Sequence, residues 1–396
     1  MEKKRSFQRD IIKHLYFSTS LSCAELSELT DKSLPLVTGM LNHLIDEGTV
    51  VETGFAPSTG GRRRLMYSLR PDFCYVVAVA MDQFVTRIAI LDMNNKPVVA
   101  VEKLSLRLNK SQEPLSLLTA AIGRVINEAN IDPSRIVGIG IGMPGFVDIN
   151  KGLNYSFFDP AGGSIAEYIE GRLGLPVFID NDSSIIALAE SRFGAARGAR
   201  TAMVINIGWG IGLGLILNSE LFRGDKGFAG EFSHLPLFVN GRLCTCGKRG
   251  CLETESSLAV VLEKVRTGLA SGAQSLIKQP LAEDLEQAID EIFAAARSGD
   301  QFVISFLSEA GYTIGRGAAV LIHLLNPELI ILSGRGAALD RLWQTPIEQA
   351  LNEHCIPRLA AGTGIKISTL GYDAELIGVA SLVMEQYPYL SGVPAQ

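Results

Sequence analysis

Residues 229–255 read AGEFSHLPLFVNGRLCTCGKRGCLETE and hold one His, three Cys and three Glu. His234, Cys244, Cys246 and Cys251 form the Cys3His donor set that structural zinc prefers, with the thiols spaced C-x-C-x4-C. The alternative is a group of buried or disulfide-bonded cysteines beside a core histidine, and the close spacing disfavours it. The sequence therefore predicts a structural zinc site.

Two carboxylates flank the predicted zinc ligands. Glu231 precedes His234 by three residues, and Glu253 follows Cys251 by two. A metal bound by this loop would hold both carboxylates rigidly beside it. We therefore expect the zinc site to position acidic side chains for another ligand.

Length and composition describe a soluble globular protein of two or three domains. The chain has 396 residues and a net charge of −6. No apolar run reaches membrane-spanning length, and the N-terminus MEKKRSFQRD lacks the apolar stretch of a signal peptide. The three cysteines outside the cluster are scattered, which fits a reducing compartment. We expect a cytoplasmic protein with no membrane partner.

Residues 1–70 are expected to form a separate domain. They carry a net charge of +2 against −8 for the remainder, and bases cluster at Lys3–Arg5 and Arg62–Arg64. Apolar spacing within residues 6–52 predicts three short helices, and two β-like segments follow around a Gly/Arg-rich tip. This order is typical of a winged helix-turn-helix that binds double-stranded DNA. A helical protein-interaction domain with a solvated charge run is the alternative.

The third predicted helix, LPLVTGMLNHLIDEG, would enter the major groove of the DNA. Its first residues, Leu34, Pro35 and Leu36, offer no hydrogen bonds to bases, so specificity would depend on the wing and on DNA shape. The candidate DNA contacts are Thr38, Gly39, Asn42 and His43 on the helix and Arg62, Arg63 and Arg64 on the wing.

From Tyr75 onward, strand and helix patterns alternate. Apolar runs within residues 75–106 predict three strands, and a helix and a strand ending at Pro144-Gly145 follow. A second series of this kind begins with the glycine-rich stretch 202–218. Between them, VFIDNDSSIIALAE predicts a strand, a polar turn and a helix. We expect an α/β architecture of two lobes with a cleft between them.

Four motifs resemble those of the ROK family, which groups bacterial sugar kinases with sugar-responsive repressors. GEFSH and CTCGKRGCLE are close to the family's ExGH and CxCGxxGCxE signatures. GIGMPGFVD is similar to the sugar-side PG loop, and IDND resembles an Asn-Asp pair of the family. In this family, an N-terminal winged helix distinguishes the repressor branch from the kinase branch.

The resemblance implies two actin-like or hexokinase-like lobes and a homodimer or homotetramer. The implied domains are the winged helix-turn-helix at 1–70, a first lobe at 71–190 completed by a C-terminal helix at about 376–390, and a second lobe at 191–375 with the zinc site and oligomerisation helices. Ser233 stands where the family signature has glycine. The implied sugar-binding residues are Asn154, Asn181, Asp182, Glu231, His234 and Glu253.

The chain departs from the family's kinases at the nucleotide side. In the kinases a strand enters D-x-G-G-T, and the matching residues here are Ala80-Met81-Asp82-Gln83-Phe84. A second phosphate turn, GWGIGLG (208–214), carries Trp209 in place of Thr, and SGRG (333–336) differs from the usual glycine pair. Backbone amides cannot cradle phosphate where side chains block the approach. We expect no ATP binding and no enzymatic activity.

These expectations favour a DNA-binding transcriptional regulator, a repressor, whose C-terminal lobes bind a sugar that modulates operator binding. Two alternatives stay open. One is a sugar kinase with an appended DNA-binding domain, and the other is a regulator controlled by a protein partner instead of a sugar.

Overall fold

A computed structural model describes residues 2–57, 63–158, 163–278 and 280–387. The contacts divide the chain into two compact units: Met1–Asn181 together with the segment from Leu376 onward, and Asp182–Glu375. Each unit contains one five-stranded sheet. In the described part of the chain, no helix combines the length and apolar character needed to cross a bilayer.

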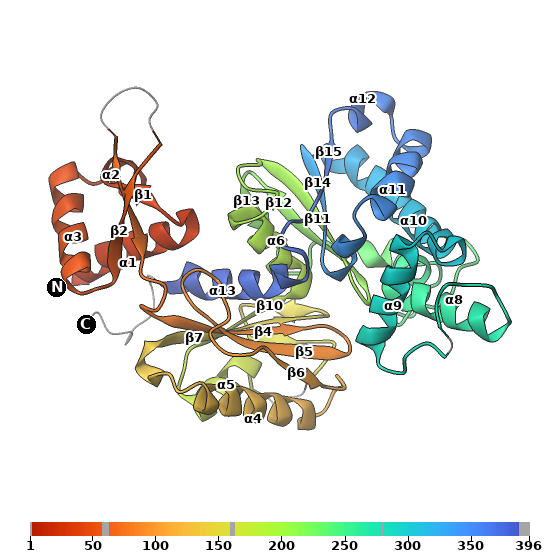
Figure 1. Ribbon diagram of the computed structural model, residues 1–396, viewed down its shortest axis with the longest axis horizontal. Helices are drawn as coiled ribbons and strands as arrows, with labels where there is room; N and C mark the ends of the chain where they lie inside the picture. The colour runs from red at the N-terminus through yellow and green to blue at the C-terminus, as the bar shows by residue number, and fades with distance from the viewer. Residues whose placement is uncertain (1, 58–62, 159–162, 279, 388–396) are drawn as a thin grey trace. The chain divides into compact units, whose positions relative to one another are not determined.

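The N-terminal elements of the first unit are three helices and a small sheet of order β1-β3-β2 (Figure 1). The apolar face of α3 is buried, as its spacing predicts, while Thr38, Gly39 and Asn42 are exposed. Ser22 and Glu25 form a capping box that begins α2. The bounds are α1 Glu2–Ser18, β1 Leu21–Ser22, α2 Cys23–Thr30, α3 Leu34–Asp46, β2 Val50–Phe55 and β3 Leu65–Leu69.

The larger sheet of the first unit has the order β10-β7-β4-β5-β6. Strands β4, β5 and β6 are antiparallel neighbours, while β7 and β10 add in parallel. Figure 1 shows α4 and α5 on one face of this sheet and α13 on the other. The bounds are β4 Tyr75–Met81, β5 Val85–Leu91, β6 Glu102–Ser105, α4 Glu113–Glu128, β7 Ile136–Met143, β8 Val147–Asp148, β9 Leu153–Asn154, α5 Ile165–Leu173, β10 Val177–Asn181 and α13 Ala374–Gln386.

The second unit repeats this topology in the order β13-β12-β11-β14-β15. Again three strands form an antiparallel meander and two add in parallel. The repeat confirms the predicted α/β fold with two similar lobes. The bounds are α6 Asp182–Arg192, β11 Thr201–Ile207, β12 Ile211–Leu217, β13 Glu220–Phe222, α7 Glu253–Ser256, α8 Leu258–Ala270, α9 Leu285–Arg297, α10 Gln301–Leu325, β14 Leu329–Ser333, α11 Arg341–His354, α12 Pro357–Ala360 and β15 Gly364–Ile367.

The structure differs from the sequence expectation where the two units join. Strand β10 ends at Asn181 and α6 begins at Asp182, so no polar turn separates them. The expected lobe boundary at residue 190 lies inside α6. This helix packs on β11 and β12 of the second unit, which explains why the second unit already begins at Asp182.

Glycines in β12 allow α6 to pack closely on the sheet. A Cβ on Gly212 would lie 1.8 Å from Ser183 Oγ, and a Cβ on Gly214 would lie 2.2 Å from Ala187 Cβ and 2.6 Å from the Ser183 carbonyl oxygen. The sequence pattern suggested that these glycines belong to a phosphate turn. In the structure they make room for the helix that carries Asp182.

We expect Gly214→Ala to destabilise the protein by about 2–4 kcal/mol, because the new methyl group overlaps backbone atoms that cannot move independently. Urea unfolding measures this. The matched control is Gly171→Ala in α5, where a Cβ meets nothing within 4 Å. That exposed helical site should gain up to about 1 kcal/mol. Equal stability of the two variants would contradict the packing role of Gly214.

Candidate functional site

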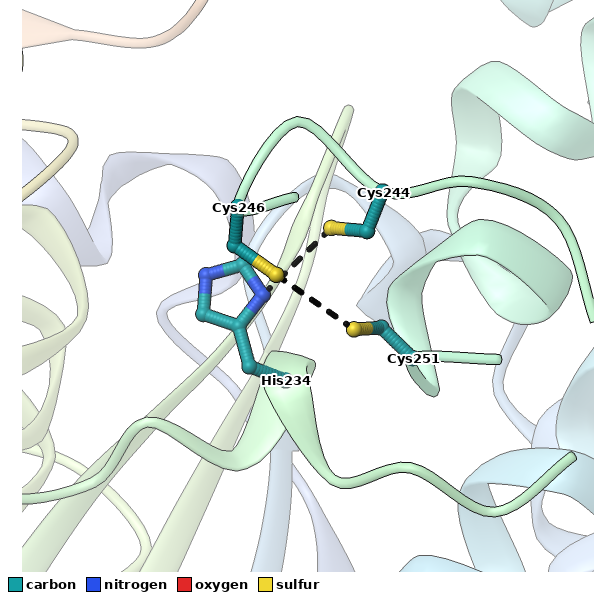
Figure 2. A group of neighbouring side chains, drawn as sticks. All are labelled: His234, Cys244, Cys246 and Cys251. Carbon is teal, nitrogen blue, oxygen red and sulfur yellow. Dashed lines mark hydrogen bonds between the residues drawn. The ribbon is translucent and has the colours of Figure 1, made fainter. Parts of the chain in front are cut away.

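The side chains of His234, Cys244, Cys246 and Cys251 converge on one point (Figure 2). His234 ends the short 3-10 turn Phe232–His234, and the cysteines lie on the loop that follows. Their ligand atoms all lie within 4.8 Å of one another. His234 Nδ1 is 3.6 Å from Cys244 Sγ, and the sulfurs of Cys246 and Cys251 are also 3.6 Å apart.

This geometry excludes a disulfide within the cluster, because bonded sulfurs lie about 2.05 Å apart. All three cysteines are free, and Cys244 and Cys251 are buried. Burial raises the pKa of the Cys251 thiol, whereas the Lys248 backbone amide lowers that of the exposed Cys246 thiol. A bound cation would favour the thiolate form of both. The four residues therefore form a candidate metal site.

Glu231 and Glu253 lie beside this cluster. His234 points Nδ1 at the thiols, and its Nε2 is 3.8 Å from Glu231 Oε2. Glu253 Oε2 accepts a hydrogen bond of 3.1 Å from the Ile211 amide at the start of β12. Desolvation by the surrounding protein raises the pKa of both carboxyl groups, although the Glu231 side chain is 41% exposed. His234 opposes this effect at each, and Glu253 adds to it at Glu231. The two ring nitrogens of His234 thus face different groups.

The backbone before Glu231 follows β12 closely. Gly230 has φ +95°, and a Cβ there would lie 2.5 Å from the Leu213 carbonyl oxygen. Only glycine combines this conformation with this approach. The neighbouring Ser233 is buried. The sheet of the second unit therefore supports the residues that position the two glutamates.

In the first unit, Asn154 and Asn181 both hold the Pro144-Gly145 loop. Asn154 Nδ2 donates to the Pro144 carbonyl oxygen at 2.9 Å, and Asn181 Nδ2 donates to that of Gly145 at 3.1 Å. Asn154 is buried, and its Oδ1 accepts from the amides of residues 156 and 157. Asn181, at the end of β10, is half-buried. The two asparagines therefore differ in accessibility: Asn154 orders the loop, while Asn181 is partly open.

Asp182 is the first residue of α6. Asp182 Oδ1 accepts hydrogen bonds from the backbone amide of Ser183 at 2.7 Å and from the Ser183 hydroxyl at 3.2 Å. A carboxylate is favourable here because the helix macrodipole is positive at this end. Asp182 thus occupies a position at which helices often bind anions.

In the β4–β5 turn, Asp82–Phe84, the Asp82 carboxylate binds two backbone amides. Asp82 Oδ1 accepts from the amide of Phe84 at 2.8 Å and from that of Val85 at 2.7 Å. A phosphate bound to this turn would compete with a covalently attached carboxylate for both donors, and like charges would repel each other. This turn is the first of the three stretches that the sequence predicts to differ from the kinase pattern.

Side chains of the second unit gather around the other two glycine-containing turns. Arg335 forms an ion pair with Glu286 and lies over the rings of Tyr372 and Trp209, at 4.2 and 5.8 Å from their centroids. Tyr372 also donates a 3.3 Å hydrogen bond to Glu286. Trp209 is buried. The sequence did not reveal this cluster, because Glu286 and Tyr372 come from elements far from both turns.

Among the expected DNA-contact residues on α3, Thr38, Gly39 and Asn42 are exposed and His43 is half-buried. Thr38 Oγ1 is 3.1 Å from Cys23 Sγ, and His43 Nε2 pairs with Glu47 at 3.3 Å. A Cβ on Gly39 would meet nothing within 4 Å. Arg63 and Arg64 are exposed, whereas Arg62 lies outside the described residues.

Comparison with known proteins matches the ROK family model to residues 78–386. The xylose repressor of Bacillus spizizenii is 26% identical over 97% of this chain and 96% of its own. A glucokinase of Halalkalibacterium halodurans is 31% identical over 72% of this chain and 88% of its own. Among solved structures, a ROK family transcriptional regulator homologous to Escherichia coli MLC has a TM-score of 0.76 and 23% identity, and covers 99% of this chain and 98% of its own.

Proposed function

The chain belongs to the ROK family, and we propose that it is a DNA-binding transcriptional repressor whose operator binding is modulated by a sugar or sugar derivative. The observation that carries the proposal is the closed β4–β5 turn, where Asp82 takes the amides that would otherwise be available to phosphate. Similarity to a xylose repressor over 97% of the chain, including the N-terminal elements, supports the same conclusion.

The N-terminal helices and hairpin act as a winged helix-turn-helix. The face of α3 that bears Thr38, Gly39 and Asn42 is exposed, and the basic residues Arg63 and Arg64 follow the hairpin tip. A helix of this kind fits the major groove, while arginines neutralise phosphates or enter the minor groove. Homodimers or homotetramers would present two such domains to a repeated operator in the cytoplasm.

We infer that polar side chains bind the sugar. Asn181, Asp182, Glu231 and Glu253 supply donors and acceptors for sugar hydroxyls, and His234 adds Nε2. Asn154 contributes through the Pro144-Gly145 loop that it orders. Sugar recognition requires several such groups held in place before the ligand arrives, because ordering them on binding costs affinity.

Zinc is the metal that fits the four-residue cluster best. Tetrahedral zinc, with bonds of about 2.3 Å to sulfur and about 2.0–2.1 Å to nitrogen, sets ligand separations of about 3.8 Å between sulfurs and about 3.5 Å between sulfur and nitrogen. The His234 Nδ1–Cys244 Sγ and Cys246 Sγ–Cys251 Sγ separations are 3.6 Å, and all four ligand atoms lie within 4.8 Å of one another. Four protein ligands leave no open coordination position, so the ion is structural. It would fix the tautomer and orientation of His234 and hold Glu231 and Glu253 beside it.

Sugar-dependent ATP turnover is expected to be absent. The β4–β5 turn holds a carboxylate where the γ-phosphate would lie, and Arg335 with its neighbours fills the region around the other two turns. A coupled assay with Mg-ATP over hexoses and amino sugars measures turnover, with a ROK glucokinase as the positive control. Turnover above the no-sugar background would favour the alternative of a kinase with an appended DNA-binding domain.

The proposed function is tested in two steps. A thermal-shift screen of monosaccharides and their phosphates identifies the ligand, because binding to the folded state raises the melting temperature. Gel shifts with DNA upstream of the adjacent genes then compare binding with and without that ligand. The proposal requires a specific operator and a sugar-dependent change in its affinity. Specific DNA binding without any sugar effect would instead favour control by a protein partner.

A further inference from the structure

The first turn of α3 exposes two leucines that the fold does not use. Leu34 and Leu36 keep 51% and 50% of their surface in contact with solvent. The helix is held by its other face, where Val37, Leu41 and Leu44 are buried. Isolated exposed leucines are common on proteins. These two, however, begin the helix that is proposed to enter the DNA, where the sequence offers no hydrogen-bonding side chain.

The surroundings of Leu36 are both apolar and basic. It borders a hollow of about 460 Å³ between α1 and α3 whose lining includes Phe7 and Met40. Lys3, Lys4 and Lys32 lie on the edge of the same hollow and are exposed. This charge pattern fits a polyanion, with lysines toward phosphates and the leucines toward the groove floor.

Helical spacing continues the leucines into the polar DNA-contact face. Leu34, Thr38 and Asn42 follow one another at intervals of four, so they form one row along the helix. Leu36, Gly39 and His43 follow one another at intervals of three and four, so they form a neighbouring row. Because Gly39 has no side chain and open space around it, it lets the helix approach the base edges closely beside Leu36.

We propose that Leu36, assisted by Leu34, recognises thymine C5-methyl groups in the major groove of the operator. The thymine methyl is the apolar group that the major groove presents, and the established partners for it are apolar side chains. This inference rests on the proposed DNA-binding function. It assigns thymine to one or two operator positions facing the start of α3, with hydrogen-bonded readout by Thr38 and Asn42 farther along the helix.

The test removes the methyl groups from the DNA. The full-length protein selects its operator from a random duplex library, and each thymine of the selected site is then replaced by deoxyuridine. We expect wild-type affinity to fall about fourfold for each contacted methyl group. The Leu36→Ser variant should bind thymine and uracil operators with equal affinity at those positions. Leu324→Ser, at the end of α10, is the control, since Leu324 is 72% exposed and lies in the other unit. It should discriminate as the wild type does.

Three outcomes would overturn the inference, the third being a special case of the second. Equal wild-type affinity for thymine and uracil operators means that no methyl is read. A Leu36→Ser variant that keeps the wild-type ratio means that another residue reads it. A changed oligomeric state of this variant by light scattering, with that ratio unchanged, makes the leucines a protein contact. If selection enriches no sequence at all, the DNA-binding function itself fails.

Discussion

Replacing Glu231 with Gln is expected to raise the sugar dissociation constant by about 5- to 13-fold while operator affinity without sugar stays unchanged. Gln keeps the shape of Glu but turns a charged hydrogen bond of about 1.5–3 kcal/mol into a neutral one of about 0.5–1.5 kcal/mol, a loss of about 1–1.5 kcal/mol. The variant should therefore keep its sugar-free operator affinity at sugar concentrations that already change the operator affinity of the wild type. Calorimetry with the identified sugar and gel shifts measure the two effects separately.

Glu255→Gln is the matched control for this variant. Glu255 lies two residues beyond Glu253, and its Oε1 accepts only a 3.4 Å hydrogen bond from the Arg242 amide. The same chemical change there should leave the sugar affinity within about twofold of the wild type. If Glu231→Gln binds sugar normally, the assignment of Glu231 to the sugar site is wrong, whatever the result for DNA binding.

Replacing Cys251 with Ser is expected to remove the metal and much of the sugar affinity together. Cys251 is fully buried and is 3.6 Å from Cys246 Sγ, so a hydroxyl cannot replace it as a soft ligand. Metal analysis should fall from about one zinc per chain to near zero. Sugar affinity should drop at least about tenfold, because the loop no longer holds His234 and the glutamates in place.

The same variant should melt about 8–16 °C below the wild type. We take the lost free energy of unfolding as about 4 kcal/mol, well below the ~10–16 kcal/mol that zinc contributes in isolated zinc-finger peptides. Each kcal/mol lowers the melting temperature by about 2–4 °C. Cys23→Ser makes the same change outside the cluster and should keep the metal and the sugar affinity. A Cys251→Ser protein with full zinc content, or a wild type purified without zinc, would contradict the structural zinc site.

The metal cluster was predictable from the sequence because its ligands lie within 18 residues, from His234 to Cys251. Over so short a span, thiols and an imidazole can converge through local turns alone. The family and the repeated α/β topology were also predictable, since strand and helix patterns recur in the same order in both halves. The capping and apolar face of the N-terminal helices likewise follow from local spacing.

Three features needed the tertiary structure. Gly212 and Gly214 looked like parts of a phosphate turn, and only the packing of α6 against β12 shows that they accommodate a helix. Asn154 looked like a ligand of the sugar, and only its burial and bonds to the Pro144-Gly145 loop show that it orders that loop. The cluster of Arg335, Glu286 and Tyr372 joins residues that are far apart in the sequence, so no sequence pattern predicts it.

The sequence by itself thus determined the chemical groups of this protein: the donors of the candidate metal site, the acidic residues beside them and the residues of the β4–β5 turn. The tertiary structure decided which of those groups remain available to a ligand. Asp82 Oδ1 accepts from the amides of Phe84 and Val85, and Glu253, in α7, is held by the Ile211 amide of strand β12. The reason is physical: residue types are set locally along the chain, whereas burial and hydrogen-bond partners depend on segments that meet only when the chain folds.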